Sequence, residues 1–424
     1  MSEIKKIWAL EILDSRGRPT VKAYCQLRSG QTGVASVPSG ASTGKAEANE
    51  LRDGDSRFNG LGCLKAVQNV NSAINRHLTG KVVYSQQELD EALIALDGTI
   101  NKSRLGANAI LAVSLAYARA KAQMKGQELH QYFAQLAEVS TQYMPRPTIN
   151  LFSGGKHAGG QVAIQDLLIV PTQQTTIEVM DCAYRVYQSA ADICDQKYGV
   201  RALSADEGGL APPFTNIEDM FEDAIKAIEM AGFVPGEDVM LALDVASSHF
   251  YNNGRYKLDS AELTPAEMID VLSRWVSKYP IVSLEDGLAE DDWENWPVLK
   301  SRIEGSSLVL GDDFLCTNPE RIHRAIDEDS ANSLLLKVNQ IGTLTEALQA
   351  FKLARKAGWN VTVSARSGET EDDWLADLAV GWQGDQIKIG SITQSERLAK
   401  YNRLLEIERE IGCSINKWPN NREN

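Results

Sequence analysis

The sequence contains no apolar run that approaches the roughly 20 residues needed to cross a bilayer. It also has no early stretch in which basic residues precede an apolar segment, so we expect no secretory signal peptide. Its six cysteines are scattered without a CxxC pair, which argues against a disulfide framework and against a zinc site. These absences predict a cytoplasmic protein that does not contact membranes.

The sequence also lacks an excess of basic residues. It has 57 Asp and Glu against 43 Lys and Arg, a net charge of −14, which argues against nucleic acid as the main partner. A small anionic substrate remains compatible with this charge, because an acidic protein can contain a local basic pocket. The 424 residues, 43% of them hydrophobic and 24% charged, are ordinary for a globular protein of two domains.

The first part of the chain predicts a small α+β domain over residues 1–135. Residues 4–28 alternate like strands around the turn "DSRGRPT", and residues 62–135 have helical periodicity, most clearly in "GANAILAVSLAYARAKA". Pro145 and Pro147 mark the passage into a second region. We therefore expect a second domain over residues 136–424.

Short apolar strands recur through the second region, and helix-like segments separate most of them. We expect strands at residues 148–152, 166–170, 239–244, 280–286, 307–313, 333–338, 360–365 and 386–390. This alternation predicts an eight-stranded α/β barrel of the TIM type. The first two strands lie too close in sequence for a crossover helix, so we expect that pair to be antiparallel.

Polar groups stand at or near the carboxyl ends of six of these strands. They are Asp244, Glu285, Asp312, Lys337, the Arg366–Ser367 turn and Lys388. A barrel gathers these strand ends on one face, where active sites lie. Any single acid could instead be a helix N-cap or a solvated loop residue. That alternative is poor for six successive strands, so the set predicts an active site.

Three of these groups, Asp244, Glu285 and Asp312, are carboxylates that would repel one another unless a cation lies between them. The oxygen donors lack Cys or His at ligand spacing, which favours Mg²⁺ over zinc. Lys337 lies in the apolar segment "LLLKV". Burial and a neighbouring cation would lower the pKa of this lysine and suit a general base. An equal alternative is a salt bridge to one of the acids.

Three glycine-rich segments contain further candidates. "PSGASTG", with Ser42, has the composition of a mobile lid, although its residues alone favour a flexible linker. "SADEGGLAPP" places Glu207 in a tight connection, where a plain turn acid is the alternative. "SGGKHAGG" contains His157, and a lone histidine is usually structural.

Motifs in order along the whole chain resemble the enolase family. They include "DSRGRPT", "PSGASTG", "ELRDGD", "DEGG", "LALDVA", "IVSLEDGL", "LLLKVNQIGTLTEAL", "RSGETED" and "IKIGS". The resemblance implies a small N-terminal α+β domain and an irregular barrel whose second strand is antiparallel. It also implies a homodimer or an assembly of dimers, and two Mg²⁺ ions per active site when substrate is bound. The implied reaction is the glycolytic hydro-lyase step, 2-phosphoglycerate to phosphoenolpyruvate and water.

The resemblance further implies a role for each candidate. Asp244, Glu285 and Asp312 resemble the ligands of the first Mg²⁺, and Ser42 resembles a ligand of the second. On the substrate side, the matching positions are the base Lys337, the acid Glu207, the carboxylate-facing Lys388, the phosphate site Arg366 with Ser367, and the pocket residues Gln165 and His157.

Two pocket positions depart from the family pattern. Asp166 stands where the family has a catalytic glutamate beside the Glu207 position, and Ala365 stands where it has a histidine. The shorter Asp166 withdraws a carboxylate by one methylene, and a misplacement of that order can cost about 10² in rate. Three hypotheses follow. The chain is an enolase, or an enolase-fold enzyme for a related phosphonate or phosphorylated hydroxy acid, or a non-catalytic member kept for binding.

Overall fold

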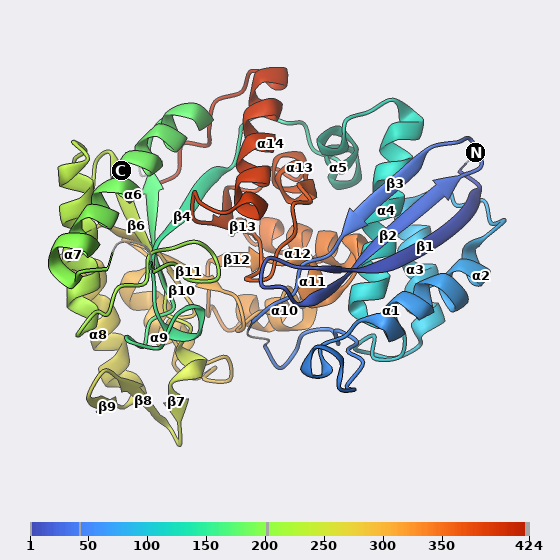
Figure 1. The fold of residues 1–424 in the computed structure, drawn as a ribbon. Helices are drawn as coiled ribbons and strands as arrows, with labels where there is room; N and C mark the ends of the chain where they lie inside the picture. The colour runs from blue at the N-terminus through green and yellow to red at the C-terminus, as the bar shows by residue number, and fades with distance from the viewer. Residues whose placement is uncertain (1, 42–43, 201–202, 420–424) are drawn as a thin grey trace.

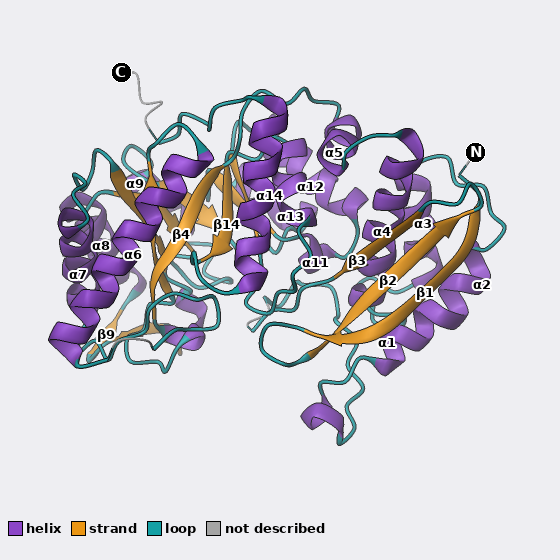
Figure 2. Ribbon diagram, turned by 45° about the horizontal axis from the view of Figure 1, so that its top comes forward, coloured by secondary structure: helices purple, strands orange, loops and turns teal. Residues whose placement is uncertain are grey.

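The computed structural model describes residues 2–41, 44–200 and 203–419 (Figure 1). The N-terminal domain contains the antiparallel sheet β1 (Ile4–Leu13), β2 (Pro19–Leu27) and β3 (Thr32–Ser36). Helices line one side of this sheet in Figure 2, and α4 (Ala107–Lys125) packs on β2 and β3. Gly33 makes that packing possible, because a Cβ there would lie 1.9 Å from the Ala116 carbonyl oxygen.

Among the described residues, the N-terminal domain contains four further α-helices and one π-helical turn. They are α1 (Leu64–Asn69), α2 (Asn75–Leu78), α3 (Gln86–Asp97) and α5 (Leu129–Ala137), with a π-helical turn at Val70–Ile74. Helix α4 is rich in alanine and buried on most sides, so it forms the centre of the domain.

Eight strands close into a barrel in the order β10-β11-β12-β13-β14-β4-β5-β6. Their bounds are β4 (Arg146–Ser153), β5 (Asp166–Pro171), β6 (Val239–Asp244), β10 (Ile281–Glu285), β11 (Leu308–Gly311), β12 (Ser333–Leu336), β13 (Asn360–Ser364) and β14 (Gln386–Gly390). Strand β5 is antiparallel to both β4 and β6, whereas the other neighbouring pairs are parallel. The predicted fold class, with its antiparallel second strand, is confirmed.

Two predicted strands, 307–313 and 333–338, extended two residues too far at their carboxyl ends. Asp312 follows β11, and its N–H donates to the side chain of Asp286 rather than to a neighbouring strand (2.9 Å). Lys337 follows β12 as the N-cap of α11 (Val338–Ile341), and its N–H donates to the Thr317 hydroxyl (2.9 Å). Both residues thus leave the ladder where their side chains reach the barrel mouth.

Helices surround the barrel. They are α6 (Thr176–Tyr198), α7 (Ile217–Met230), α8 (Pro265–Lys278), α9 (Trp296–Ile303), α10 (Pro319–Asp327), α12 (Leu344–Lys356), α13 (Trp374–Gly381) and α14 (Ser395–Ile411). Between β6 and α8 stands a small meander of β7 (Tyr251–Asn252), β8 (Arg255–Leu258) and β9 (Ala261–Leu263). Among the described residues, none of the helices combines the length and the apolar character needed to cross a membrane.

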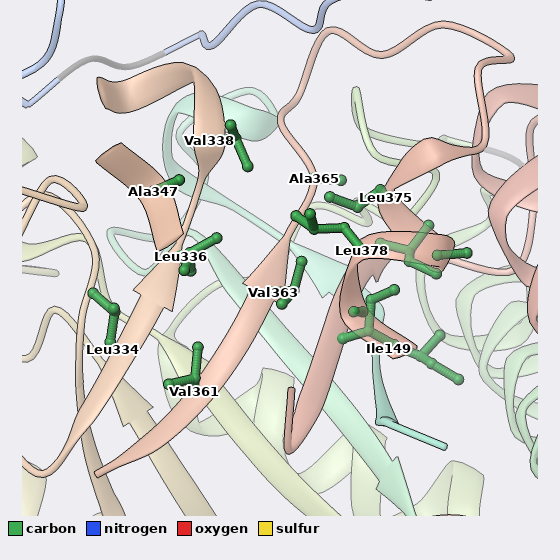
Figure 3. Close-up of a cluster of buried hydrophobic side chains, with 14 of the residues drawn as sticks. Ile149, Leu334, Leu336, Val338, Ala347, Val361, Val363, Ala365, Leu375 and Leu378 are labelled. Atoms are coloured by element: carbon green, nitrogen blue, oxygen red, sulfur yellow. The ribbon is translucent and has the colours of Figure 1, made fainter. Parts of the chain in front are cut away.

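The main core lies between the strands and these helices (Figure 3). Leu334 and Leu336 of β12, Val361 and Val363 of β13, and Leu375 and Leu378 of α13 are all buried in it. Ala365, just beyond β13, belongs to the same cluster. The apolar cluster therefore supports the strand ends that carry the polar groups.

Candidate active site

A cavity of about 20 Å³ lies where the carboxyl ends of the barrel strands meet the segment before Ser42. Its lining residues are Ala41, His157, Gln165, Glu207, Asp244, Lys337, Ser364, Ala365, Arg366, Ser367 and Lys388. A volume of this size accommodates about one water molecule. The polar side chains of the site therefore contact one another directly.

Most of the candidates from the sequence meet at this cavity. Glu285 and Asp312 reach it through their bonds to Lys388 and Lys337. Asp166 lies behind His157 and is not among the described residues that line the cavity. Ser42 lies outside the described residues.

Lys388 joins two of the predicted metal ligands. Its ammonium group donates to Asp244 Oδ2 (2.8 Å) and to both oxygens of Glu285 (2.9 and 2.7 Å). Burial and the neighbouring Asp244 raise the pKa of Glu285 well above its usual range. Burial alone would lower the pKa of Lys388, but Asp244 and Glu285 raise it. Negative charge is thus in excess here, which suits a cation.

Lys337 forms an ion pair with Asp312, whose other oxygen accepts a bond from Gln340 Nε2 (2.8 Å). Burial alone would lower the pKa of Lys337, as the sequence predicted, but the Asp312 carboxylate raises it. The salt bridge that the sequence left open as an alternative is therefore present in this structure. Both lysines at the barrel mouth neutralise candidate metal ligands.

His157, Asp166 and Glu207 form a second group of polar contacts. The Asp166 carboxylate accepts a bond from Ser153 Oγ (2.6 Å) and lies 2.7 Å from His157 Nδ1. His157 Nε2 lies 3.9 Å from Glu207 Oε1, and Asn150 Nδ2 donates to the other Glu207 oxygen (3.0 Å). Burial alone would lower the pKa of His157, but Asp166 and Glu207 raise it to about 9. The imidazole is therefore held by carboxylates on both sides.

The donors at the barrel mouth fit a hard cation. In one cluster of described residues, carboxylate oxygens of Asp286, Asp312 and Asp313 lie within 4.8 Å of one another. In a second cluster, a ring nitrogen of His157 lies within the same distance of carboxylate oxygens of Asp166 and Glu207. Gln165 donates to Asp244 (3.1 Å), and its buried Oε1 has no hydrogen-bond partner among the described residues. That oxygen is an acceptor that a cation could satisfy.

Sequence reasoning missed Asp286. Its oxygens accept the N–H groups of Asp312 (2.9 Å) and Asp313 (2.8 Å), so it shapes the turn after β11. Burial and the two neighbouring aspartates raise the pKa of Asp286. The sequence has two adjacent acids at the ends of both β10 and β11, Glu285 with Asp286 and Asp312 with Asp313. The prediction took only the first acid of each pair as a metal ligand.

The anion-binding turn contacts the N-terminal part of the chain. Arg366 forms a two-pronged ion pair with Glu47 (3.1 and 3.2 Å) and donates to Asn339 Oδ1 (3.0 Å). Arg16 donates to the Ser367 hydroxyl (3.2 Å). Sequence reasoning missed Glu47 and Arg16, because polar residues of loops leave no periodic signal, and it missed Asn339, because the four-residue helix α11 is too short to show one.

Two family models match the chain. The model described as the enolase N-terminal domain matches residues 4–133, and the model described as the enolase C-terminal TIM barrel domain matches residues 141–421. The chain belongs to the enolase family. Both matches support a lyase of the enolase superfamily, and the acidic clusters agree with the metal dependence of that family.

Two positions of this chain, Ala365 and Asp166, depart from the sequence pattern of the enolase family. Ala365 lines the cavity and is 6% exposed, and its N–H donates to the Lys388 carbonyl (2.8 Å). In the family pattern a histidine occupies this cavity-lining position. Asp166 is fully buried and has both oxygens engaged by Ser153 and His157. The chain therefore departs from the family pattern at one residue that lines the cavity and at one that contacts His157.

Proposed function

We propose that this chain is a Mg²⁺-dependent hydro-lyase of the phosphopyruvate hydratase type, which interconverts 2-phosphoglycerate with phosphoenolpyruvate and water. One observation carries the proposal. A single cavity is lined by Lys337, Glu207, Lys388 and Arg366, which supply a base, an acid and cations for a carboxylate and a phosphate. The partner is thus a small, anionic, phosphorylated substrate, and the reaction belongs to glycolysis.

Asp244, Glu285 and Asp312 would hold the first Mg²⁺, and Ser42 would join a second when substrate is bound. Bound Mg²⁺ would stabilise the extra negative charge that develops on the substrate carboxylate. The excess of buried carboxylate and the unpartnered Gln165 Oε1 support this assignment.

The side chains divide the remaining chemistry. Lys337, once its bond to Asp312 is released and its proton lost, would take the proton from C2 of the substrate. Lys388 would bind the substrate carboxylate, and Arg366 with Ser367 would bind the phosphate. Glu207 would protonate the departing C3 hydroxyl, because hydroxide is a poor leaving group. Each such proton transfer is typically worth about 10²–10⁴ in rate.

A second candidate function rests on Ala365 and Asp166. The cavity has a methyl group in place of an imidazole, and the Asp166 carboxylate is withdrawn behind His157. Both changes favour a related substrate, such as a phosphonate analogue or a bulkier phosphorylated hydroxy acid. A non-catalytic member is the weakest alternative, since Lys337, Lys388, Glu207 and the metal ligands are all retained.

The deciding experiment follows phosphoenolpyruvate formation from 2-phosphoglycerate with purified protein and Mg²⁺, alongside the Lys337→Ala variant. Turnover that the variant lacks would support the first proposal. Slow or absent turnover with retained hydrogen exchange at C2 would favour the related substrate. Absence of both, in the presence of Mg²⁺, would support the non-catalytic alternative.

We also propose a homodimer, or an assembly of dimers, in the cytoplasm. Large apolar side chains are exposed on two separate elements, β1 (Leu13) and α6 (Ile177 and Tyr184), and a second copy could cover either of them. All six cysteines are free thiols, which fits a reducing compartment. Light scattering of the purified protein tests the dimer.

A further inference from the structure

Arg366 lines the cavity and also contacts a segment that lies earlier in the sequence. Both terminal nitrogens of its guanidinium bond the carboxylate of Glu47 (3.1 and 3.2 Å). Both side chains are buried, at 4% and 7% exposure. Among the described residues that line the cavity, Glu47 is absent, so its carboxylate does not occupy the place of a substrate anion. It supports the arginine from behind.

Glu47 also organises its own segment. Its Oε1 accepts the N–H of Gly44 (3.0 Å), and its N–H donates to the Gly44 carbonyl (3.2 Å). Gly44 lies against the turn after β11, where a Cβ would be 2.4 Å from Cys316 Sγ. The N–H of Ala48 donates to the Gln340 carbonyl (2.7 Å). Residues 44–48 are therefore docked on the barrel. Glu47 supplies the buried ion pair of that contact, and Lys45 adds an exposed pair with Asp291 (2.5 Å).

The buried charge of Arg366 explains why the Glu47 carboxylate lies beside it. A buried guanidinium needs an ionic partner, and a planar, two-pronged pair also sets its orientation. Without Glu47, Arg366 would keep the bond to Asn339 (3.0 Å) and the charges of Asp312 and Asp313 nearby, but it would lose the two-pronged pair that sets its orientation.

We propose that Glu47 is a positioning residue that holds Arg366 for anion binding and couples occupation of the anion site to docking of residues 44–48. This inference rests on the proposed function only in taking Arg366 as an anion site. The coupling is reciprocal, since a group that stabilises docking of the segment by binding Arg366 is itself bound more tightly when the segment is docked.

The test uses the full-length protein and inorganic phosphate, with and without Mg²⁺. Phosphate affinity is measured by calorimetry, and amide hydrogen exchange of residues 44–48 is measured in the same samples. We expect Glu47→Gln to weaken phosphate binding by about tenfold and to abolish the protection that phosphate confers on these amides. Glu47→Asp should show a phosphate affinity and an amide protection between those of the unaltered protein and of Glu47→Gln.

Glu346→Gln is the matched control. Glu346 also pairs with a buried cation of the N-terminal domain, Lys102 (2.8 Å), but it is not among the described cavity residues. This variant should leave both measurements unchanged. Circular dichroism before each titration shows that every variant is folded.

Three outcomes would overturn the inference. If Glu47→Gln binds phosphate like the unaltered protein, Glu47 does not position Arg366, and the proposed function is unaffected. If affinity falls but phosphate still protects residues 44–48, the coupling is absent. If the unaltered protein binds no phosphate under either condition, both the coupling and the anion site of the proposed function are lost.

Discussion

His157 and Asp166 form a buried pair in which Asp166 Oδ2 lies 2.7 Å from Nδ1, so that Nε2 is the ring nitrogen near Glu207 (3.9 Å). Asp166 is one methylene shorter than the glutamate of the enolase family, and it contacts the histidine while remaining outside the set of described cavity-lining residues. An imidazole therefore lies between the carboxylates of Asp166 and Glu207. This relationship leads to the first prediction.

Restoring the family residues should raise enolase activity. We expect Asp166→Glu and Ala365→His each to increase phosphoenolpyruvate formation by about tenfold or more, because placement errors of an ångström can cost about 10² in rate. Initial rates with 2-phosphoglycerate and Mg²⁺ provide the measurement. Ala365→Leu is the control, since it adds bulk without an imidazole and should not increase the rate. No gain from either restoring change would count against enolase as the native activity.

Removing Lys388 should destabilise the metal-free protein. Lys388→Met leaves the buried carboxylates of Asp244 and Glu285 without their cation, and breaking such a buried pair typically costs about 3–5 kcal/mol. Urea denaturation in EDTA and in Mg²⁺ measures the change, and Mg²⁺ should recover part of the loss if it binds the same carboxylates.

Lys352→Ala is the control for this prediction. The Lys352–Glu138 pair is exposed (46% and 82%), so the variant should change the free energy of unfolding by about 0–1 kcal/mol. Equal effects of the two variants in EDTA would show that the Lys388 cluster is not a buried ionic unit.

Asp90 should make stability decrease as the pH rises. It is fully buried and accepts bonds from Thr345 and Gln86, and burial raises its pKa from 3.8 to about 6. Between these two values the folded state binds more protons than the unfolded state, so this group's contribution to stability falls with increasing pH. The fall amounts to ~3 kcal/mol at most.

Asp90→Asn should abolish this component. Chemical denaturation at pH 4 and at pH 7 gives the free energy of unfolding of both proteins, and the variant should gain stability relative to the unaltered protein at the higher pH. A constant difference between the two proteins at both pH values would contradict the raised pKa, because other carboxylates contribute equally to both.

Gly33 should tolerate no side chain. A Cβ at this position would lie 1.9 Å from the Ala116 carbonyl oxygen and 2.3 Å from the Ala120 nitrogen, both backbone atoms of α4. Gly33→Ala should therefore lower the stability by about 3 kcal/mol or more, because strand and helix must separate. Gly305→Ala places its Cβ more than 4 Å from every heavy atom of the described residues other than its chain neighbours, so it should have an effect within about 0.5 kcal/mol. Thermal denaturation of both variants checks the contrast.

Much of the fold could be predicted, because short patterns of apolar and polar residues along the chain determine where strands and helices form. The eight barrel strands are short apolar runs between helical segments, and β6 and β14 have the predicted bounds. The antiparallel direction of β5 followed from the short connection before it. The strand ends at Asp312 and Lys337 were less predictable, because a side chain from elsewhere in the chain decides where each residue leaves the ladder.

The sequence by itself determined the order of the elements and the residue types at the barrel mouth, because periodicity and composition act over a few residues. Only the tertiary structure decided which charges pair. Glu47 and Arg366 are 319 positions apart, and Arg16 and Ser367 are 351 apart, so no local pattern connects them. Likewise, only packing shows that Asp166 lies behind His157, since a single methylene decides whether a carboxylate reaches the cavity or the neighbouring ring.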